Sequence, residues 1–270
     1  MTVLDIMSHS VKAEVMTEAK NILWLSAHPE PQSLTGALRD AGISHLNHAG
    51  HQVVESDLYR MNWNPVLQPI PLEGQPISVT ADIRRAFIEH SQPEDVRLEQ
   101  HKVSQADALI VQFPLWWYGL PAILKGWFDR VFVSGFAFGK NPVDGRRLRF
   151  EQGPFVGKRA LALTTLGDRE ASIGPRGKSG ELNELLFGLL HGTFAYTGMD
   201  VLQPWALASA DHLGAQAYAE VENSLISRLD GLFDEPALPY RPLYSGQYTS
   251  DWELKPELLP GKSGLSVHLA

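Results

Sequence analysis

The sequence predicts an α/β domain in which helices cover both faces of a parallel sheet, followed by a C-terminal tail. Two observations carry this prediction. Short apolar runs of strand length alternate with longer amphipathic runs from residue 21 to residue 233, and this alternation is typical of parallel sheets with helical crossovers. Residues 234–270 are rich in proline and contain aromatic side chains, but they lack a domain-sized core pattern.

Five apolar runs provide the strands, and amphipathic runs provide the helices. The predicted strands are residues 21–27, 51–59, 106–115, 158–167 and 199–210. The predicted helices are residues 34–50, 81–90, 120–132, 181–198 and 215–233. Gly50 and Gly198 suit helix C-termini, and Pro121 suits a first helical turn. Residues 60–80 contain several prolines and no clear period, so they are predicted to be an excursion from the alternation.

Helix 120–132 carries the clearest helical periodicity in the chain. Its apolar residues recur at helical spacing and form one stripe: Ile123, Leu124, Trp127, Phe128, Val131 and Phe132. The run that precedes it, residues 106–115, is the most apolar of the predicted strands. We therefore expect this strand to lie in the centre of the sheet and the helix to pack against it.

Composition restricts the class of protein. Among 270 residues, 44% are hydrophobic and the net charge is −8, which permits a sizeable core and argues against a nucleic-acid surface. Cysteine is absent, so disulfides and thiolate metal sites are excluded. The histidines of residues 45–51 lack nearby acidic partners, so no metal site is predicted.

Membrane and targeting segments are not predicted either. No run has membrane-span length, and residues 1–20 lack a signal-peptide pattern. We expect a cytoplasmic protein with a loose extension at residues 1–20.

Three loops follow the carboxyl ends of predicted strands, where parallel sheets bind their ligands. Residues 26–35 open a helix, and Ser33 or Thr35 could cap a helix start that binds phosphate; the alternative is an ordinary loop. Residues 114–120 read PLWWYGL, whose aromatic rings could stack on a flat ligand while backbone N–H groups contact its polar rim. The alternative there is an apolar patch covered by a partner or the tail. Residues 164–180 offer hydroxyl and N–H groups.

Four segments together resemble the flavin-dependent NAD(P)H:quinone oxidoreductase (DT-diaphorase-like) family. They are FPLWWYGLPAILKGWFDRVF (113–132), ESDLYRMNWNP (55–65), GPFVGKRALALTT (153–165) and GLSV (264–267). The resemblance covers residues 21–270 and implies a flavodoxin-like, doubly wound five-stranded parallel sheet over residues 21–233. It also implies a homodimer, with the tail at 234–270 packing on the partner. Chain length and tail resemble the FAD-binding branch rather than the shorter FMN-binding relatives.

The resemblance also implies roles for particular residues. Those expected to hold the FAD pyrophosphate and ribose are His28, Ser33, Leu34 and Thr35. Those expected to line the isoalloxazine ring are Pro114, Leu115, Trp116, Trp117 and Tyr118. Those expected at its pyrimidine edge are Thr164, Thr165 and Gly167. The expected catalytic residues are Trp117, Tyr118 and Gly167, and the expected acceptor pocket contains Tyr118, Phe138, Tyr244 and Tyr248.

The third loop departs from the family pattern. The family reads TTGG and then supplies a tyrosine and a histidine that stabilise negative charge on the reduced flavin. This chain reads TTLG and has Ile173 or Ser172, and then Ser179, in those places. Lys178 and Arg176 are the cations nearest in sequence that could replace the pair. Two tyrosines of the family lid correspond to Phe138 and Lys140.

The activity implied by the resemblance is an FAD-dependent, ping-pong, two-electron reduction of quinone-like acceptors with NAD(P)H as hydride donor. Two alternatives remain open. The altered third loop is compatible with a flavin reductase of nitro, azo or pathway-specific aromatic compounds. A non-catalytic flavodoxin-like regulatory module is the alternative from another class, although such a module does not need an aromatic tail.

Overall fold

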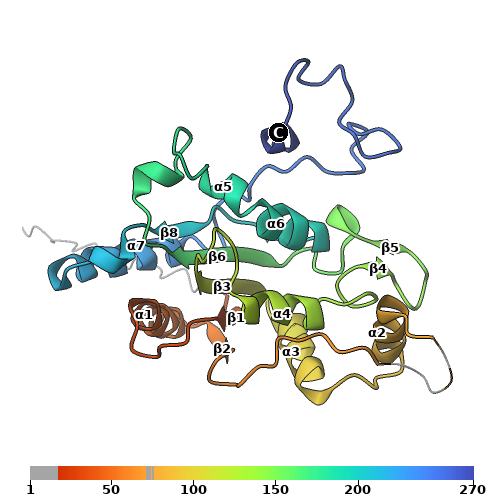
Figure 1. Cartoon of the computed structure of the whole chain (residues 1–270), viewed down its shortest axis with the longest axis horizontal. Helices are drawn as coiled ribbons and strands as arrows, with labels where there is room; N and C mark the ends of the chain where they lie inside the picture. The colour runs from red at the N-terminus through yellow and green to blue at the C-terminus, as the bar shows by residue number, and fades with distance from the viewer. Residues whose placement is uncertain (1–17, 71–73, 75) are drawn as a thin grey trace, which may run out of the picture.

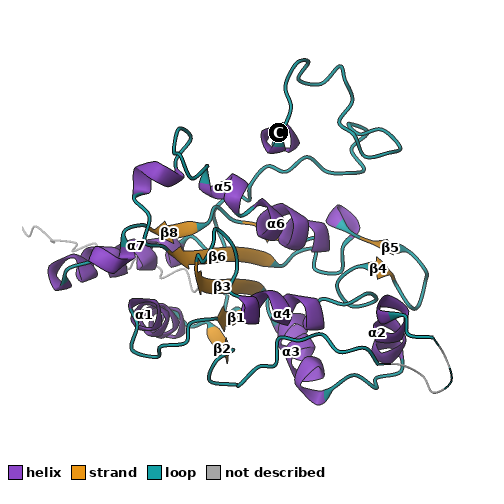
Figure 2. Cartoon of the chain, in the orientation of Figure 1, coloured by secondary structure: helices purple, strands orange, loops and turns teal. Residues whose placement is uncertain are grey.

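A parallel sheet with the predicted doubly wound order forms the centre of the molecule (Figures 1 and 2). The computed structural model describes residues 18–270 except 71–73 and 75. The strands pair in the order β2-β1-β3-β6-β7, and β8 pairs with β6 beyond β7, so β7 and β8 share the fifth position. This is the order of flavodoxin-like sheets. The strands are β1 (Asn21–Ser26), β2 (Gln52–Asp57), β3 (Ala108–Pro114), β6 (Arg159–Thr165), β7 (Asp200–Val201) and β8 (Trp205–Leu207).

Helices cover both faces of the sheet and divide the core into two clusters. Helices α1 (Leu34–His48) and α7 (Ala215–Asp230) pack with Trp24 and other β1, β3 and β6 residues on one face. Helices α3 (Glu94–Gln105) and α4 (Ala122–Val131) pack on the other face with the alternate strand residues, which include Leu23 and Val111. Every residue of β3 is buried, as expected for a central parallel strand.

The predicted stripe of α4 faces the sheet as expected. Leu124, Trp127, Phe128 and Val131 are buried, and the Trp127 indole N–H donates to the buried carboxylate of Glu99 on α3 at 2.8 Å. On the same helix, Gly126 lies against Pro65 of the excursion so closely that a Cβ at this position would be 2.2 Å from the Pro65 carbonyl oxygen. The close approach fixes the excursion on α4.

Substitution of Gly126 by alanine is therefore expected to cost about 2–3 kcal/mol of folding free energy, because the added methyl group meets backbone that cannot swing aside. Urea unfolding of the two proteins measures the difference. Gly188→Ala is the matched control, since Gly188 also lies within a helix, α6 (Phe187–Leu189), and has open space around it. Equal losses for the two variants would show that the contact with Pro65 is unimportant.

Several predicted elements differ from the structure. The single helix predicted over 181–198 is wrong: the chain forms the short helices α5 (Leu182–Leu185) and α6 (Phe187–Leu189), then a π-helical turn at Leu190–Phe194 and a 3-10 turn at Ala195–Thr197. The Thr193 hydroxyl donates to the Gly188 carbonyl at 3.0 Å, so this side chain bonds a carbonyl five residues earlier within the widened turn.

Other differences concern short or polar segments. The strand predicted over 199–210 is divided around Pro204, which has no N–H to donate to a ladder. Helix α3 was not predicted, and neither was the hairpin of β4 (Gly139–Lys140) and β5 (Arg147–Leu148). The helix predicted over 81–90 is α2 (Val79–Ile88). The extension predicted at 1–20 lies outside the described residues up to residue 17.

The tail follows α7 and extends past α5 and α6, away from the sheet (Figure 1). Its start is fixed to the sheet by a bond from the Leu238 amide to the Val201 carbonyl at 2.7 Å. Its end folds back, since the Ala270 amide donates to the Pro239 carbonyl at 2.7 Å. A 3-10 turn at Leu265–His268 is its one helical segment within the described residues. Across the described part of the chain, no helix combines the length and apolarity needed to cross a membrane.

Candidate functional site

The three predicted loops meet at the carboxyl edge of the sheet. Gln112 of β3 donates its amide to the Thr35 carbonyl at 2.9 Å, and Trp24 of β1 donates its indole N–H to the Gln112 amide oxygen at 2.9 Å. The Thr35 and Thr165 hydroxyls lie 2.9 Å apart, and the Leu115 amide donates to the Thr165 carbonyl at 2.8 Å. A buried polar network therefore fixes the loops relative to one another.

The first loop ends in a helix start without acidic side chains. Ser33 is the N-cap of α1, and its hydroxyl accepts from the Gly36 amide at 3.1 Å. No acidic residue occupies the first turn, so nothing there opposes a bound anion. The His28 ring accepts from the Glu30 amide at 3.1 Å and orders the loop before the cap. Such a helix start can bind a phosphate group.

The second loop is a two-residue hairpin turn with unusual backbone angles. Trp116 and Gly119 exchange backbone hydrogen bonds of 3.2 and 3.0 Å, and the two residues between them, Trp117 and Tyr118, have φ angles of 51° and 55°. Two consecutive residues with positive φ define a type I′ turn, in which asparagine and glycine are the usual residues. The turn leaves Trp117 98% exposed and Tyr118 46% exposed.

The third loop joins the aromatic turn through a residue that sequence analysis missed. The Tyr118 hydroxyl donates to Asp168 Oδ2 at 2.9 Å, and the Ser179 hydroxyl donates to the same oxygen at 2.9 Å. These hydroxyls, Ser179 first and then Tyr118, lower the pKa of Asp168 from its ordinary value. The sequence contains one sign of this contact: a carboxylate, Asp168, directly follows Gly167 in a loop that also contains serines.

The threonines at the end of β6 act inside the protein. Thr164 donates its hydroxyl to the Phe113 carbonyl at 3.0 Å, and Thr165 contacts Thr35. Both are buried. Next to them, Gly167 lies beside Asp211, whose Oδ2 would be 2.6 Å from a Cβ added at this glycine. The side chains of the two threonines are therefore used in internal hydrogen bonds. A ligand at this edge of the sheet would meet backbone groups instead.

Free backbone amides occur on two of the loops. Within the residues that the structure describes, no acceptor pairs with the amides of Trp117, Tyr118, Gly167 or Asp168. Amides of this kind can hold the carbonyl and ring-nitrogen acceptors of a flat heterocycle. Together with the exposed indole and the helix start of α1, they fit the polar rim, the ring face and the phosphates of a flavin nucleotide.

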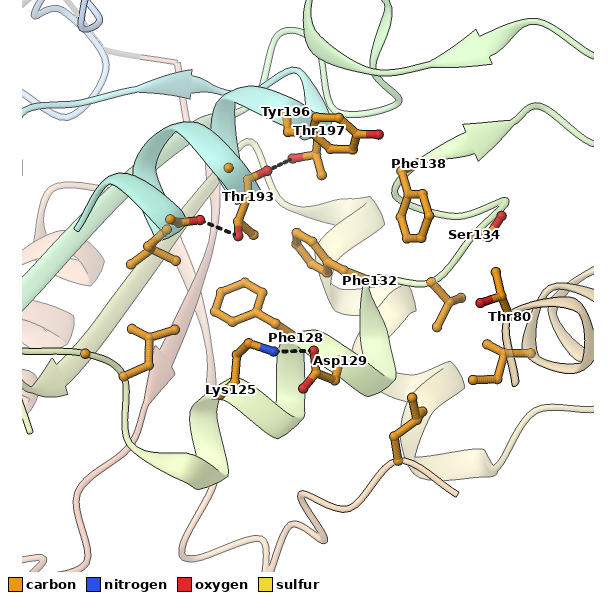
Figure 3. A pocket seen from close by; sticks show the side chains of 18 of the residues that line it. Thr80, Lys125, Phe128, Asp129, Phe132, Ser134, Phe138, Thr193, Tyr196 and Thr197 are labelled. Carbon is orange, nitrogen blue, oxygen red and sulfur yellow. Dashed lines mark hydrogen bonds and ion pairs between the residues drawn. The ribbon is translucent and has the colours of Figure 1, made fainter. Parts of the chain in front are cut away.

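A groove of about 670 Å³ begins at the base of the aromatic turn, at Gly119 and Leu120, and continues between α4 and the segment of residues 185–197. Figure 3 shows Phe128 and Phe132 on one side, with Phe138 and Tyr196 further along. The walls are mainly apolar. A Lys125–Asp129 ion pair of 2.6 Å is an exception (Figure 3).

Three residues of the predicted acceptor pocket, Phe138, Tyr244 and Tyr248, form no hydrogen bond or ring contact with Trp117 or Tyr118 among the described residues. Phe138 lines the groove. The Tyr244 hydroxyl accepts from Arg149 Nε at 2.9 Å, and the Tyr248 hydroxyl lies 3.0 Å from His268 Nδ1. Their predicted role at a flavin site stays a prediction.

The residues at the places of the family's tyrosine and histidine have other contacts. Ile173 is buried, and the Ser172 hydroxyl donates to the Arg169 carbonyl at 2.7 Å. Arg176 and Lys178 are exposed and have no ion-pair partner among the described residues. Groups of three or more potential metal ligands are absent from the described part of the chain.

This arrangement of sheet, helix start and aromatic turn defines the class of flavodoxin-like proteins. A family model for the flavodoxin-like fold matches residues 20–229. A ribosyldihydronicotinamide dehydrogenase-like protein of Penicillium crustosum is 36% identical over 84% of this chain and 86% of its own length. NAD(P)H dehydrogenase [quinone] 1 of Rattus norvegicus is 33% identical over 92% of both chains.

A solved structure shares almost the whole architecture. A Klebsiella pneumoniae protein, provisionally assigned as a quinone reductase, has a TM-score of 0.89 and 41% identity, and the match covers 93% of this chain and 100% of that one. The chain belongs to the flavodoxin-like NAD(P)H:quinone oxidoreductase family. The predicted fold class, family and enzyme class are thereby confirmed.

Proposed function

We propose that this chain is an FAD-dependent NAD(P)H oxidoreductase that reduces quinone-like acceptors and acts as a homodimer. The observation that carries the proposal is the aromatic turn, where Trp117 is almost fully exposed beside unpaired amides at the carboxyl edge of the sheet. An indole held in this position presents a flat surface to a ring, and relatives with the same fold are named as quinone reductases.

The flavin supplies two-electron hydride chemistry when bound. Ser33, Leu34 and Thr35 would hold its pyrophosphate at the start of α1, because free amides and the helix dipole favour anions there. Trp117 and Tyr118 would provide the ring contact, and their amides would orient the polar rim. NAD(P)H and the acceptor would occupy the same exposed face in turn, which is a ping-pong scheme.

The residues of the groove support a dimer. The groove has an apolar lining in which Leu67 and Val79 are exposed and Phe138 and Tyr196 are half-buried; such a surface is costly to leave in water, and it begins at the aromatic turn. A second subunit placed there would cover these side chains. Phe138, Tyr244 and Tyr248 would then be supplied to the site across the interface.

The printed names of the relatives differ in the hydride donor. Relatives named NAD(P)H dehydrogenase [quinone] 1 match 92% and 93% of this chain, whereas those named ribosyldihydronicotinamide dehydrogenase or ribosyldihydronicotinamide dehydrogenase-like match 82% to 84%. The longer shared region supports NAD(P)H as donor. The relatives do not favour nitro or azo acceptors, or a regulatory module. A cytoplasmic location stays a prediction.

Flavin identity and turnover test the proposal directly. The purified protein is expected to be yellow and to release FAD, as identified by mass spectrometry. NADH, NADPH and N-ribosyldihydronicotinamide should then be compared as donors with menadione as acceptor. Release of FMN alone would contradict the FAD assignment, and a protein without flavin or turnover would contradict the enzyme.

Removal of residues 234–270 tests the dimer. The truncated protein is expected to lose menadione reduction and to shift towards the monomer in light scattering, because aromatic anchors such as Tyr244 would leave the interface. Circular dichroism checks that the sheet domain remains folded. A monomeric truncation with full activity would refute the proposed role of the tail.

A further inference from the structure

The aromatic turn is strained, and its own packing does not restrain it. Trp117 and Tyr118 are both in the left-handed region, where a residue with a side chain costs about 1–2 kcal/mol relative to the right-handed one. The Trp117 side chain is 98% exposed, so it has no packing that would hold it there. Strained conformations persist only when their surroundings fix them. Something other than the Trp117 ring must therefore hold this turn.

One set of side-chain contacts provides the restraint. The Tyr118 and Ser179 hydroxyls each donate to Asp168 Oδ2 at 2.9 Å, and the two hydroxyl oxygens lie 3.0 Å apart. Tyr118 belongs to the loop after β3, whereas Asp168 and Ser179 belong to the loop after β6. Since the hydroxyls hold the pKa of Asp168 below its ordinary value, the carboxylate is ionised at neutral pH, and bonds to an ionised group are the stronger kind.

We propose that Tyr118, Asp168 and Ser179 form a latch that holds the aromatic turn against the third loop and so preforms the slot for the flavin ring. The three are positioning residues in this role. The latch keeps the Trp117 amide and ring on one side of the slot, and it keeps the Gly167 and Asp168 amides on the other. The proposal rests on the proposed flavin site.

The latch can be opened without removing an aromatic ring. Tyr118→Phe keeps the ring and removes the hydroxyl, Asp168→Ala removes the acceptor, and Ser179→Ala removes the second donor. Ser179→Thr restores a hydroxyl and should behave as the parent. Tyr218→Phe on α7 is the matched control, because it removes a tyrosine hydroxyl outside the three loops.

Two measurements report the latch. Without flavin, trypsin should cleave after the exposed Arg176 about fivefold faster in Tyr118→Phe, because losing one bond raises the population of the open loop. With FAD added, the dissociation constant followed by flavin fluorescence should rise about five- to tenfold. The urea midpoint should change little, since the released turn also loses its strain.

The design separates the latch from general damage and from the flavin assignment. Tyr118→Phe combined with Asp168→Ala should be no worse than Asp168→Ala alone, because the single change already removes the acceptor of the Tyr118 bond; additive effects would overturn the latch. Unchanged cleavage or unchanged FAD affinity in Tyr118→Phe would also overturn it. A parent protein that binds no FAD refutes the proposed function instead, and in that case the cleavage comparison still measures whether the loops are held together.

Discussion

Replacing Trp117 by asparagine is expected to stabilise the flavin-free protein by about 1 kcal/mol and to weaken flavin binding about 10- to 100-fold. Asparagine is tolerated in the left-handed region and is the usual first residue of a type I′ turn. The indole is 98% exposed in the single chain, so its removal sacrifices almost no internal packing. The loss of affinity follows from the roughly 1.5–3 kcal/mol that burial of a large apolar side chain contributes.

The two expected effects of Trp117→Asn have opposite signs, because stability rises while flavin affinity falls. Urea unfolding of flavin-free protein gives the stability, and titration with FAD followed by menadione reduction gives the function. Trp117→Phe serves as control, because it keeps both an aromatic ring and the strained φ, so stability and affinity should stay near those of the parent. A less stable asparagine variant would show that the indole packs within the subunit and that strain is not kept for function.

The central sheet was predictable because its pattern is strong. Four of the five predicted strands match observed strands within a few residues, since fully buried parallel strands such as β3 are continuous apolar runs. Helix α3 was missed because charged and polar side chains dominate residues 94–105. Its buried surface depends on Val96, Val103 and the carboxylate of Glu99. The Glu99 carboxylate accepts a hydrogen bond from Trp127, and this bond exists only in the folded protein.

The broken helix shows where local patterns fail. Residues 181–198 have helical spacing, but the Thr193 hydroxyl bonds the Gly188 carbonyl inside a π-helical turn. Hydrophobic periodicity does not report such a contact, because it depends on side-chain hydrogen bonds. The broken helix matters for the candidate site, because Tyr196 lies in this irregular segment and lines the groove.

The candidate site was predictable as three loops but not as a set of contacts. Strand order brings residues 27–35, 114–120 and 165–180 to one edge, and this follows from the alternation of elements. The link from Tyr118 to Asp168 spans 50 residues of sequence and depends on the left-handed φ of Tyr118, which is unusual for a tyrosine. A sequence with two aromatic residues at these positions gives no direct sign of that angle.

A row of stacked rings joins the tail to the domain. His191 of the π-helical turn stacks on Phe187 at 4.6 Å between ring centres and contacts Tyr240 edge-on at 4.9 Å. His268 lies 6.0 Å from His191 and stacks on Tyr248, whose hydroxyl is 3.0 Å from its Nδ1. Two histidines of this row therefore lie where the tail meets the rest of the chain.

Both histidines resist protonation in the folded protein. Burial, and then the charge of His268, lower the pKa of His191 to about 4. Burial, and then Arg241, lower the pKa of His268. Burial raises the pKa of the neighbouring Tyr248, and the charged groups that also act on it are Arg241 and then Glu151. Protonating the row would place positive charges in partly buried positions and beside Arg241, so the neutral forms favour the docked tail.

Acid is therefore expected to release the tail. A histidine whose pKa is lower in the folded state takes up a proton more readily when released, so docking is fully stabilised above pH 6.5 and weakens as the pH falls from about 6.5 towards 4. Because His191 is partly exposed, we expect about 1–3 kcal/mol of docking free energy to be lost over this range.

Two measurements and one variant test this expectation. Light scattering should show dissociation of the proposed dimer, menadione reduction should fall in parallel, and both should recover at pH 7. His191→Phe keeps the stack without a titrating group and should move the transition to lower pH; an unchanged transition in this variant would assign the acid sensitivity to other groups, such as carboxylates.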